Sequence, residues 1–171
     1  KYLDFFQEVT TTTKELILHW QRVGFVHGVM NTDNMSIHGI TIDYGPYGWM
    51  DDFNPNWTPN TTDAEGKRYR FGNQPNIALW NLLQLANALY PLIEEAKLLE
   101  TILDNYSNEF QSDFMKMMCS KIGFQNLKTS DESIVNQLLV TIRETETDMT
   151  IFYRLLATVS KNDTAEEALS K

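Results

Sequence analysis

The sequence predicts a mainly α-helical protein with one small β-hairpin. Over most of the 171 residues, apolar side chains recur every three or four positions, which is the period of an amphipathic helix. Only two short apolar runs, 35–37 and 40–42, resemble strands, and they flank a His-Gly turn at 38–39. Hydrophobic residues make up 42% of the chain, enough to bury a core. We therefore expect residues 1–171 to form a single domain.

The first expected helix covers residues 2–23. Its apolar positions are spaced by three, four or seven residues and comprise Phe6, Val9, Leu16, Trp20 and Val23. The threonine run at 10–13 is a weak point, because β-branched side chains lose rotamer freedom in a helix, and a second helical segment could begin there. Gly24 is expected to end the helix. Residues 25–34 then form a loop that leads into the hairpin, which is expected to be the only sheet.

A long loop over residues 44–74 is expected next. Four of the eight glycines and three of the five prolines fall within it. Pro75 then opens a helix over 75–93. Apolar residues surround this helix on all sides: Ile77, Leu79, Trp80, Leu82, Leu83, Leu85, Leu89, Leu92 and Ile93. Such a helix is normally buried at the centre of its domain.

The remainder, residues 95–159, is expected to be helical as well. Apolar spacing predicts one or two helices over 95–122. Thr129 and Glu132 have the spacing of a capping box for a following helix, and Asp148 is a candidate N-cap of the last core helix. Residues 160–171 are polar and are expected to form a frayed tail.

Charge and composition limit the classes of partner. The formal net charge of −9 and a pI near 4.7 argue against a nucleic acid as the main partner. No apolar run approaches the roughly 20 residues of a membrane span, so no membrane partner is expected. Cys119 is the single cysteine, which fits a reducing compartment. The sequence does not fix an oligomeric state.

The polar residues that suggest chemistry lie within residues 24–50. Asp33 and Asn34 are adjacent on the predicted loop, and Asp43 follows nine residues after Asn34. A carboxylate and an amide oxygen from either side of a hairpin could hold Mg²⁺ against phosphate oxygens. Alternatively, Asp43 is a turn or cap residue, and Asn34 bonds local backbone. The residues alone leave both interpretations open.

The same residues resemble the catalytic loop of protein kinases. The interval from His27 to Asn34 matches the histidine-to-asparagine interval of that loop, and Asp-Tyr-Gly at 43–45 stands where the kinase fold has Asp-Phe-Gly. One difference is important. The kinase base belongs two residues after the histidine, where this chain has Val29, and a carboxylate reappears only at Asp33.

A more specific resemblance is to the selenoprotein O (YdiU, UPF0061) family. It rests on His-Gly-Val-Met-Asn-Thr-Asp-Asn-Met-Ser at 27–36, Thr-Ile-Asp-Tyr-Gly-Pro-Tyr-Gly at 41–48 and Tyr-Arg-Phe-Gly-Asn-Gln-Pro at 69–75. Members of that family have a kinase-like fold and transfer AMP, rather than phosphate, onto protein hydroxyls. The resemblance covers most of residues 1–160 and is densest over 24–83.

The resemblance implies the C-terminal lobe of a protein-kinase-like fold. Residues 24–50 would contain the catalytic loop, 44–74 an activation-like loop, and 75–93 the central helix. The sequence lacks a glycine-rich phosphate loop and a recognisable strand Lys with a helix Glu partner, which a kinase-like fold needs to grip ATP. The chain is therefore expected to be the C-terminal lobe of a longer protein whose N-lobe lies outside it, and to be inactive by itself.

The resemblance also implies roles for individual residues. The reaction would be transfer of AMP from ATP to Ser, Thr or Tyr hydroxyls of protein substrates, with Mg²⁺ or Mn²⁺. Asn34 and Asp43 would be the metal ligands, and Asp43 would contact ATP phosphates through the metal. Asp33 would be the catalytic base, or alternatively a supporting carboxylate that does not contact the reacting atoms, because Val29 stands in the position of the kinase base. Independently of the resemblance, the position of His27 beside Gly28, on its apolar side, predicts that His27 holds the loop by hydrogen bonds rather than transferring protons. The expected location is the cytoplasm of a bacterium, or the mitochondrion of a eukaryote.

Two other functions remain open. Ordinary phosphotransfer is one, although Val29 in the position of the kinase base argues against it. A non-catalytic pseudokinase module that binds nucleotide or partners is the other, although the acidic residues argue against a complete loss of metal binding. The basic residues Lys67, Arg68 and Arg70 could contact phosphate or belong to a solvated face of the long loop.

Overall fold

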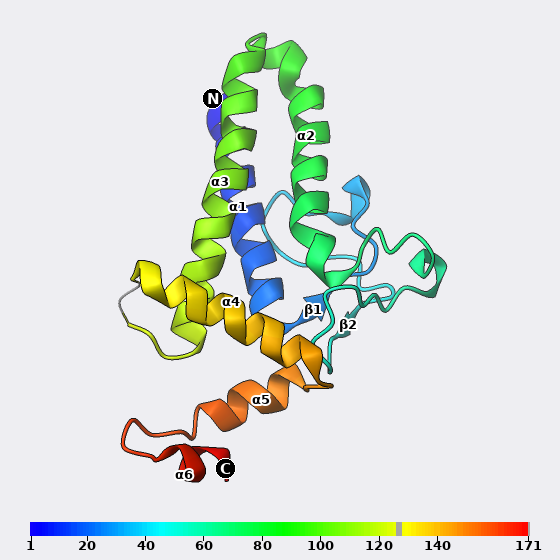
Figure 1. Ribbon diagram of the computed structural model, residues 1–171. Coiled ribbons are helices and arrows are strands. Elements are labelled where there is room, and N and C mark those ends of the chain that lie inside the picture. The colour runs from blue at the N-terminus through cyan, green and yellow to red at the C-terminus, as the bar shows by residue number, and fades with distance from the viewer. Residues whose placement is uncertain (126–127, 171) are drawn as a thin grey trace.

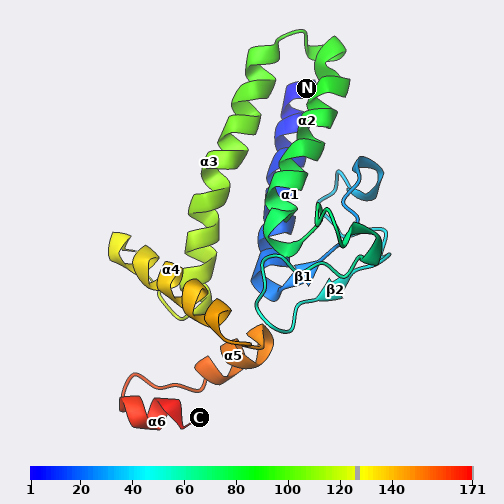
Figure 2. The same cartoon turned by 45° about the vertical axis from the view of Figure 1, so that its right-hand side comes forward.

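Three long helices form the body of the protein: α1 (Tyr2–Val23), α2 (Gln74–Ile93) and α3 (Ala96–Lys121). The structure is a computed structural model that describes residues 1–125 and 128–170. Figures 1 and 2 show α2 and α3 as an antiparallel pair joined by a tight turn, with α1 lying against both. The prediction of a mainly helical fold is confirmed, and residues 95–121 contain one long helix rather than two.

The first helix runs without a break through the threonine run. The hydroxyls of Thr10, Thr11 and Thr12 each donate to the carbonyl four residues earlier, so these polar groups are satisfied within the helix. The second helical segment that the sequence allowed there does not form. Gly24 ends the helix as predicted, because it adopts a left-handed conformation (φ 72°) and its N–H donates to the Trp20 carbonyl.

The predicted position of the sheet is wrong. The strands β1 (Phe25–Val26) and β2 (Gly48–Trp49) pair antiparallel, with Phe25 opposite Trp49. Residues 25–26, which were expected to be loop, therefore form a strand. Phe25 and Val26 are 4% and 0% exposed, and this burial decides which segment joins the sheet.

The predicted hairpin is reduced to one isolated bridge between Met35 and Thr41. Ile37 and Ile40 remain 45% and 55% exposed, so no second layer covers the apolar face that the pattern suggested. Two short strands without such a layer are only marginally stable. Three turns of 3₁₀ helix lie along the connecting loops: η1 (Thr32–Asn34), η2 (Thr61–Asp63) and η3 (Phe71–Asn73).

The second helix is buried on one face rather than on all sides. Ile77, Ala78 and Leu82 face the interior, whereas Trp80 and Leu83 are each 42% exposed. The expectation of a fully buried central helix is therefore wrong. The number of apolar residues in a helix does not specify how many other elements pack against it. In this structure α2 packs mainly on α1 and α3.

The C-terminal part contains α4 (Thr129–Glu144), α5 (Met149–Leu156) and the short α6 (Ala165–Leu169). Asp148 caps α5 as predicted, because its Oδ1 accepts the N–H of Ile151 at 2.8 Å.

Two details of this C-terminal part differ from the predictions. At the start of α4 the Asp131 carboxylate accepts the N–H of Lys128, so the cap lies one residue before the predicted Thr129–Glu132 pair. The predicted frayed tail contains α6, which Thr164 and Glu167 cap reciprocally. None of the helices in the described residues is both long enough and apolar enough to span a membrane.

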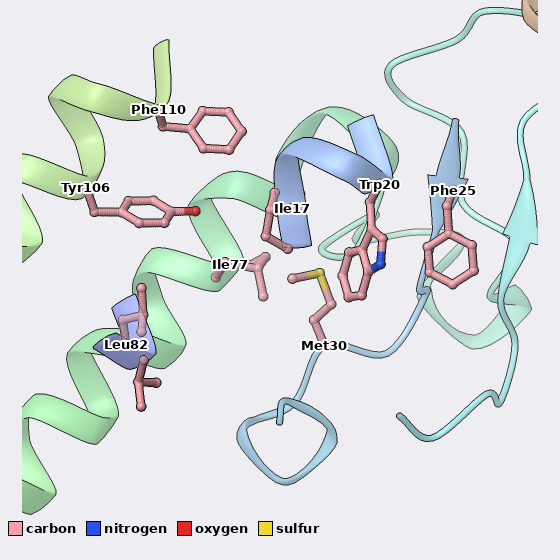
Figure 3. Packing of buried hydrophobic residues seen from close by; sticks show 10 residues of the cluster. Ile17, Trp20, Phe25, Met30, Ile77, Leu82, Tyr106 and Phe110 are labelled. Atoms are coloured by element: carbon pink, nitrogen blue, oxygen red, sulfur yellow. The ribbon is translucent and has the colours of Figure 1, made fainter. Parts of the chain in front are cut away.

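The main core lies where α1, α2, α3 and the loop after β1 meet. Its buried members are Val9, Ile17, Trp20, Phe25, Met30, Ile77, Ala78, Leu82, Tyr106 and Phe110. Figure 3 shows Met30 extending from the loop into the core toward Ile77 and Trp20. Met30 is completely buried, so the loop that carries Asp33 and Asn34 is anchored by a core side chain.

Candidate active site

Three asparagine amides hold the loop after β1. They bind successive carbonyls through Nδ2, each at 3.0 Å: Asn60 to Gly28, Asn34 to Val29, and Asn81 to Met30. These asparagines come from the long loop, from the loop itself and from α2. We call them the asparagine clamp. Because each carbonyl has its own donor, the backbone path leading to Asp33 is fixed from three directions.

His27 joins this loop to the segment that precedes Asp43. Its side chain is 1% exposed, its Nε2 lies 2.9 Å from the Ile42 carbonyl oxygen, and the Val29 N–H donates to its Nδ1. With Nδ1 acting as an acceptor, Nε2 carries the proton and donates to Ile42. The structural role expected for His27 is confirmed, since one imidazole ring holds both segments.

Gln74, the first residue of α2, secures the other side of the same backbone. Its side chain is fully buried, its Oε1 accepts the N–H of His27, and its Nε2 donates to the Phe25 carbonyl, both at 2.9 Å. The sequence pattern predicted no role for Gln74, Asn60 or Asn81. A polar residue at the start of an apolar helix was the only signal for Gln74, and it did not identify the partner.

Gly28 occupies a position that no other residue type fits. Its φ is +82°, and a Cβ built there would lie 2.4 Å from the carbonyl oxygen of Pro46. The residues just after Asp43 therefore pack directly on the backbone of the loop. This close approach explains the glycine of the His-Gly pair in physical terms.

We expect Gly28→Ala to lower the free energy of unfolding by at least about 2 kcal/mol, because left-handed strain and a steric clash add together. Gly123→Ala is the matched control, since Gly123 also has a positive φ (+91°) but has no atom within 4 Å of an added Cβ. Urea denaturation of both variants measures the difference. Equal losses in the two variants would show that the approach of Pro46 to Gly28 carries no cost.

Asp43 is exposed and adopts a left-handed conformation (φ 54°). The residues before it are fixed, because Thr41 Oγ1 accepts from Trp20 Nε1 at 3.0 Å and the Ile42 carbonyl accepts from His27. The residue two positions later, Gly45, donates its N–H to the Asp43 carbonyl at 2.7 Å. Asp tolerates this backbone conformation better than most residues, and the backbone that carries the carboxylate is held on both sides.

The β-bridge between Met35 and Thr41 pairs two short antiparallel segments of the chain. The two proposed metal ligands lie at the same end of these paired segments. Asn34 directly precedes Met35, and Asp43 follows two residues after Thr41 on the antiparallel segment. Asn34 donates through Nδ2 to local backbone, which leaves Oδ1 available. The interpretation of Asn34 as a residue that bonds local backbone is therefore confirmed for Nδ2, and the metal role of Oδ1 stays a prediction.

Among the described residues, the Asp33 and Asp43 carboxylates and Asn34 Oδ1 have no hydrogen-bond or ion-pair partner. Hard oxygen donors of this kind suit Mg²⁺. The described part of the chain has no group of three or more His, Cys, Asp or Glu side chains that could hold a metal. Mg²⁺ commonly binds through one or two protein oxygens together with substrate phosphates, so this donor set fits the ion.

The basic residues of the long loop have other contacts. The Arg68 guanidinium lies 4.9 Å from the centre of the Trp80 ring, and Arg70 Nη1 donates to the Lys67 carbonyl at 3.0 Å. Arg68 and Arg70 therefore stabilise the long loop and its contact with α2. Lys67 is exposed, with a left-handed backbone (φ 45°).

An aromatic cluster that was not predicted from the sequence surrounds Phe25. The rings of Tyr44, Tyr47 and Trp49 lie 5.4–6.4 Å from the Phe25 ring, measured between centroids. Tyr44, which directly follows Asp43, and Trp49 of β2 are 59% and 56% exposed. The repeated aromatic residues of Tyr-Gly-Pro-Tyr-Gly-Trp were a signal that could have predicted this cluster.

Comparison with known proteins identifies the family. The profile of the family described as "Protein adenylyltransferase SelO" matches residues 1–170. A protein named protein nucleotidyltransferase YdiU from Flavobacterium johnsoniae is 58% identical over 171 residues, which is 100% of this chain and 33% of that protein. The protein of the same name from Rhodopirellula baltica is 57% identical over 155 residues, 90% of this chain and 29% of that protein. This chain thus spans about a third of the length of these curated relatives, and it belongs to the SelO family.

Proposed function

We propose that this chain forms the C-terminal, kinase-like lobe of a protein adenylyltransferase. The reaction would transfer AMP from ATP to Ser, Thr or Tyr hydroxyls of proteins. The family description and the names of the relatives support the reaction class. The observation that carries the proposal is the Met35–Thr41 bridge, which sets Asn34 and Asp43 at one end of a bridged pair. The phosphate grip of an N-lobe would come from elsewhere in a longer protein.

Each residue of the site has a role in this proposal. Asn34 Oδ1 and the Asp43 carboxylate would hold Mg²⁺ or Mn²⁺, which would neutralise phosphate charge when bound with ATP. Asp33 accepts the proton of the attacking hydroxyl. The hydroxyl oxygen forms a bond to the α-phosphorus while the bond to the oxygen that bridges to the β-phosphate breaks, so pyrophosphate leaves.

The surroundings of Val29 favour Asp33 as the base over a kinase-like base at position 29. The Val29 N–H donates to His27, and its carbonyl accepts from Asn34, so the backbone there serves to hold the loop. Its side chain has no proton acceptor. Asp33, in η1, is exposed and has no partner among the described residues. A kinase-type phosphotransferase would need a base that position 29 lacks.

Two labels test the proposal. Full-length protein is incubated with Mg²⁺, a protein acceptor and ATP labelled on either the α- or the γ-phosphate. We expect label on the acceptor from α-labelled ATP only. Label from γ-labelled ATP would show phosphotransfer instead. A shift of the melting temperature by Mg·ATP without transfer of either label would show a non-catalytic nucleotide-binding module.

The 171-residue chain alone is expected to bind Mg·ATP weakly and to transfer nothing. Its sequence has no glycine-rich phosphate loop, and its proposed site offers few oxygen ligands for the metal. Isothermal titration calorimetry on residues 1–171 measures this affinity, after circular dichroism has verified the helical fold. Micromolar binding of Mg·ATP would contradict the expectation, because it would mean that this lobe grips ATP unaided.

A further inference from the structure

A cavity of about 320 Å³ lies behind the loop that carries Asp33 and Asn34. Its walls come from α1, α2 and residues 32–37, and they include Val9, Thr13, Met35, Asn81 and Leu85. None of its lining residues, all of which the structure describes, is charged. Pockets of roughly 300–1,000 Å³ with apolar walls and a few polar groups are typical small-molecule sites.

Two polar side-chain atoms in the wall of this cavity, Asn81 Oδ1 and the Thr13 hydroxyl oxygen, have no hydrogen-bond partner among the described residues. Asn81, 8% exposed, donates through Nδ2 to the Met30 carbonyl, but its buried Oδ1 accepts nothing. Thr13 is 4% exposed, and its hydroxyl makes none of the intrahelical bonds that its threonine neighbours make. A buried acceptor left without a donor destabilises the folded state, and a ligand that supplies the donor relieves this cost.

We propose that this cavity binds a small uncharged molecule with an apolar body and one hydrogen-bond donor, such as a primary amide, that donates to Asn81 Oδ1. The uncharged walls offer no partner for an ionic ligand. The limited volume of the cavity and the burial of Asn81 Oδ1 favour a small molecule over a polypeptide segment. Asn81 Oδ1 is covered in this structure, so a side chain of the cavity wall has to move as the donor enters.

Such a ligand would contact residues 32–37, the loop of the candidate active site, on the side that faces α1 and α2. Asn81 holds the Met30 carbonyl through its other side-chain atom, and Met35 directly follows Asn34. Occupation of the cavity therefore restrains the backbone on both sides of Asp33. The binding site does not depend on the proposed transfer reaction, so the two hypotheses can fail separately.

Methionine methyl groups provide the readout. The protein is labelled with ¹³C at the methionine methyls, the Met35 signal is assigned with Met35→Leu, and benzamide is titrated by nuclear magnetic resonance. We expect a saturable shift at Met35 and none at Met117, which packs in a separate cluster. N,N-dimethylbenzamide lacks the donor and should bind about fivefold more weakly. Benzamidinium, which is charged, should not bind. Equal affinity for the two amides, or no saturable shift, would overturn the proposal.

Matched variants locate the site. Ala88→Phe should fill the cavity and abolish the shift, whereas Asn87→Phe, at the preceding position of α2 and outside the lining, should leave it unchanged. Persistent binding by Ala88→Phe, with its fold verified by circular dichroism, would overturn the location. If the Ala88→Phe variant fails to fold, the comparison of benzamide with N,N-dimethylbenzamide still tests the proposal, because it uses the unmodified protein. The titration is repeated on full-length protein, where loss of binding would show that polypeptide occupies the cavity and would refute a small-molecule site.

Discussion

Replacing Asp43 with alanine in the full-length protein should abolish AMP transfer and change stability little. The carboxylate is exposed and contacts no partner among the described residues, so its removal breaks no contact of the fold. Alanine at φ 54° costs roughly 1 kcal/mol of backbone energy, which bounds the loss of stability. The proposed metal site would lose its only charged ligand. Transfer from α-labelled ATP and thermal melting measure the two effects.

Two controls separate the metal role of Asp43 from a role in the turn. Asp43→Asn keeps the size and the tolerance of a left-handed backbone, so it should melt like the parent protein and still lose transfer. Asp51→Ala removes an exposed aspartate of the long loop that follows Asp43 and should retain activity. Unchanged transfer by Asp43→Ala would exclude Asp43 as an essential ligand. A large loss of stability would instead support the turn or cap role.

Replacing Asp33 with asparagine should lower the rate of AMP transfer about 10²- to 10⁴-fold while leaving the affinity for ATP nearly unchanged. The amide keeps the size of the side chain but cannot accept a proton, so the defect should fall on the chemical step. Because Asp33 is exposed in η1 and has no partner among the described residues, the fold should be preserved. ATP affinity and single-turnover transfer, measured on the same preparation, distinguish binding from chemistry.

The double variant Val29→Asp, Asp33→Asn tests whether the base can be moved to the kinase position. We expect no rescue, because the proposed geometry places the α-phosphate near residue 33 rather than residue 29. Val29→Asp alone serves as the control for damage to the loop. Near-normal transfer by Asp33→Asn would refute the base assignment, and rescue by the double variant would refute the placement of the α-phosphate.

The parts of the fold that the sequence predicted correctly depend on local interactions. The bounds of α1, its end at Gly24 and the Asp148 cap follow from periodicity and from hydrogen bonds spanning a few residues. The sheet was misplaced because Phe25 and Trp49 are 24 positions apart, and burial selected them over a local apolar pattern. The exposure of one face of α2 likewise depends on neighbours that its own sequence does not specify.

The candidate site shows the same division between local and distant contacts. A structural role for His27 was predicted from its position beside Gly28 and the apolar run. The roles of Asn60, Gln74 and Asn81 were not, because each is defined by a carbonyl or N–H group far away in the sequence. The sequence around an asparagine or a glutamine does not indicate which distant backbone group its side chain will bind.

The asparagine clamp also has a consequence for the order of folding. Asn34 lies 5 residues from the carbonyl it binds, whereas Asn60 and Asn81 lie 32 and 51 residues from theirs. Closing long loops costs chain entropy, and contacts between distant residues tend to form late. The three helices can therefore pair before the loop between them acquires its final path. An intermediate that already has native helicity would still lack the ordered loop, so catalytic competence should be the last property gained during refolding.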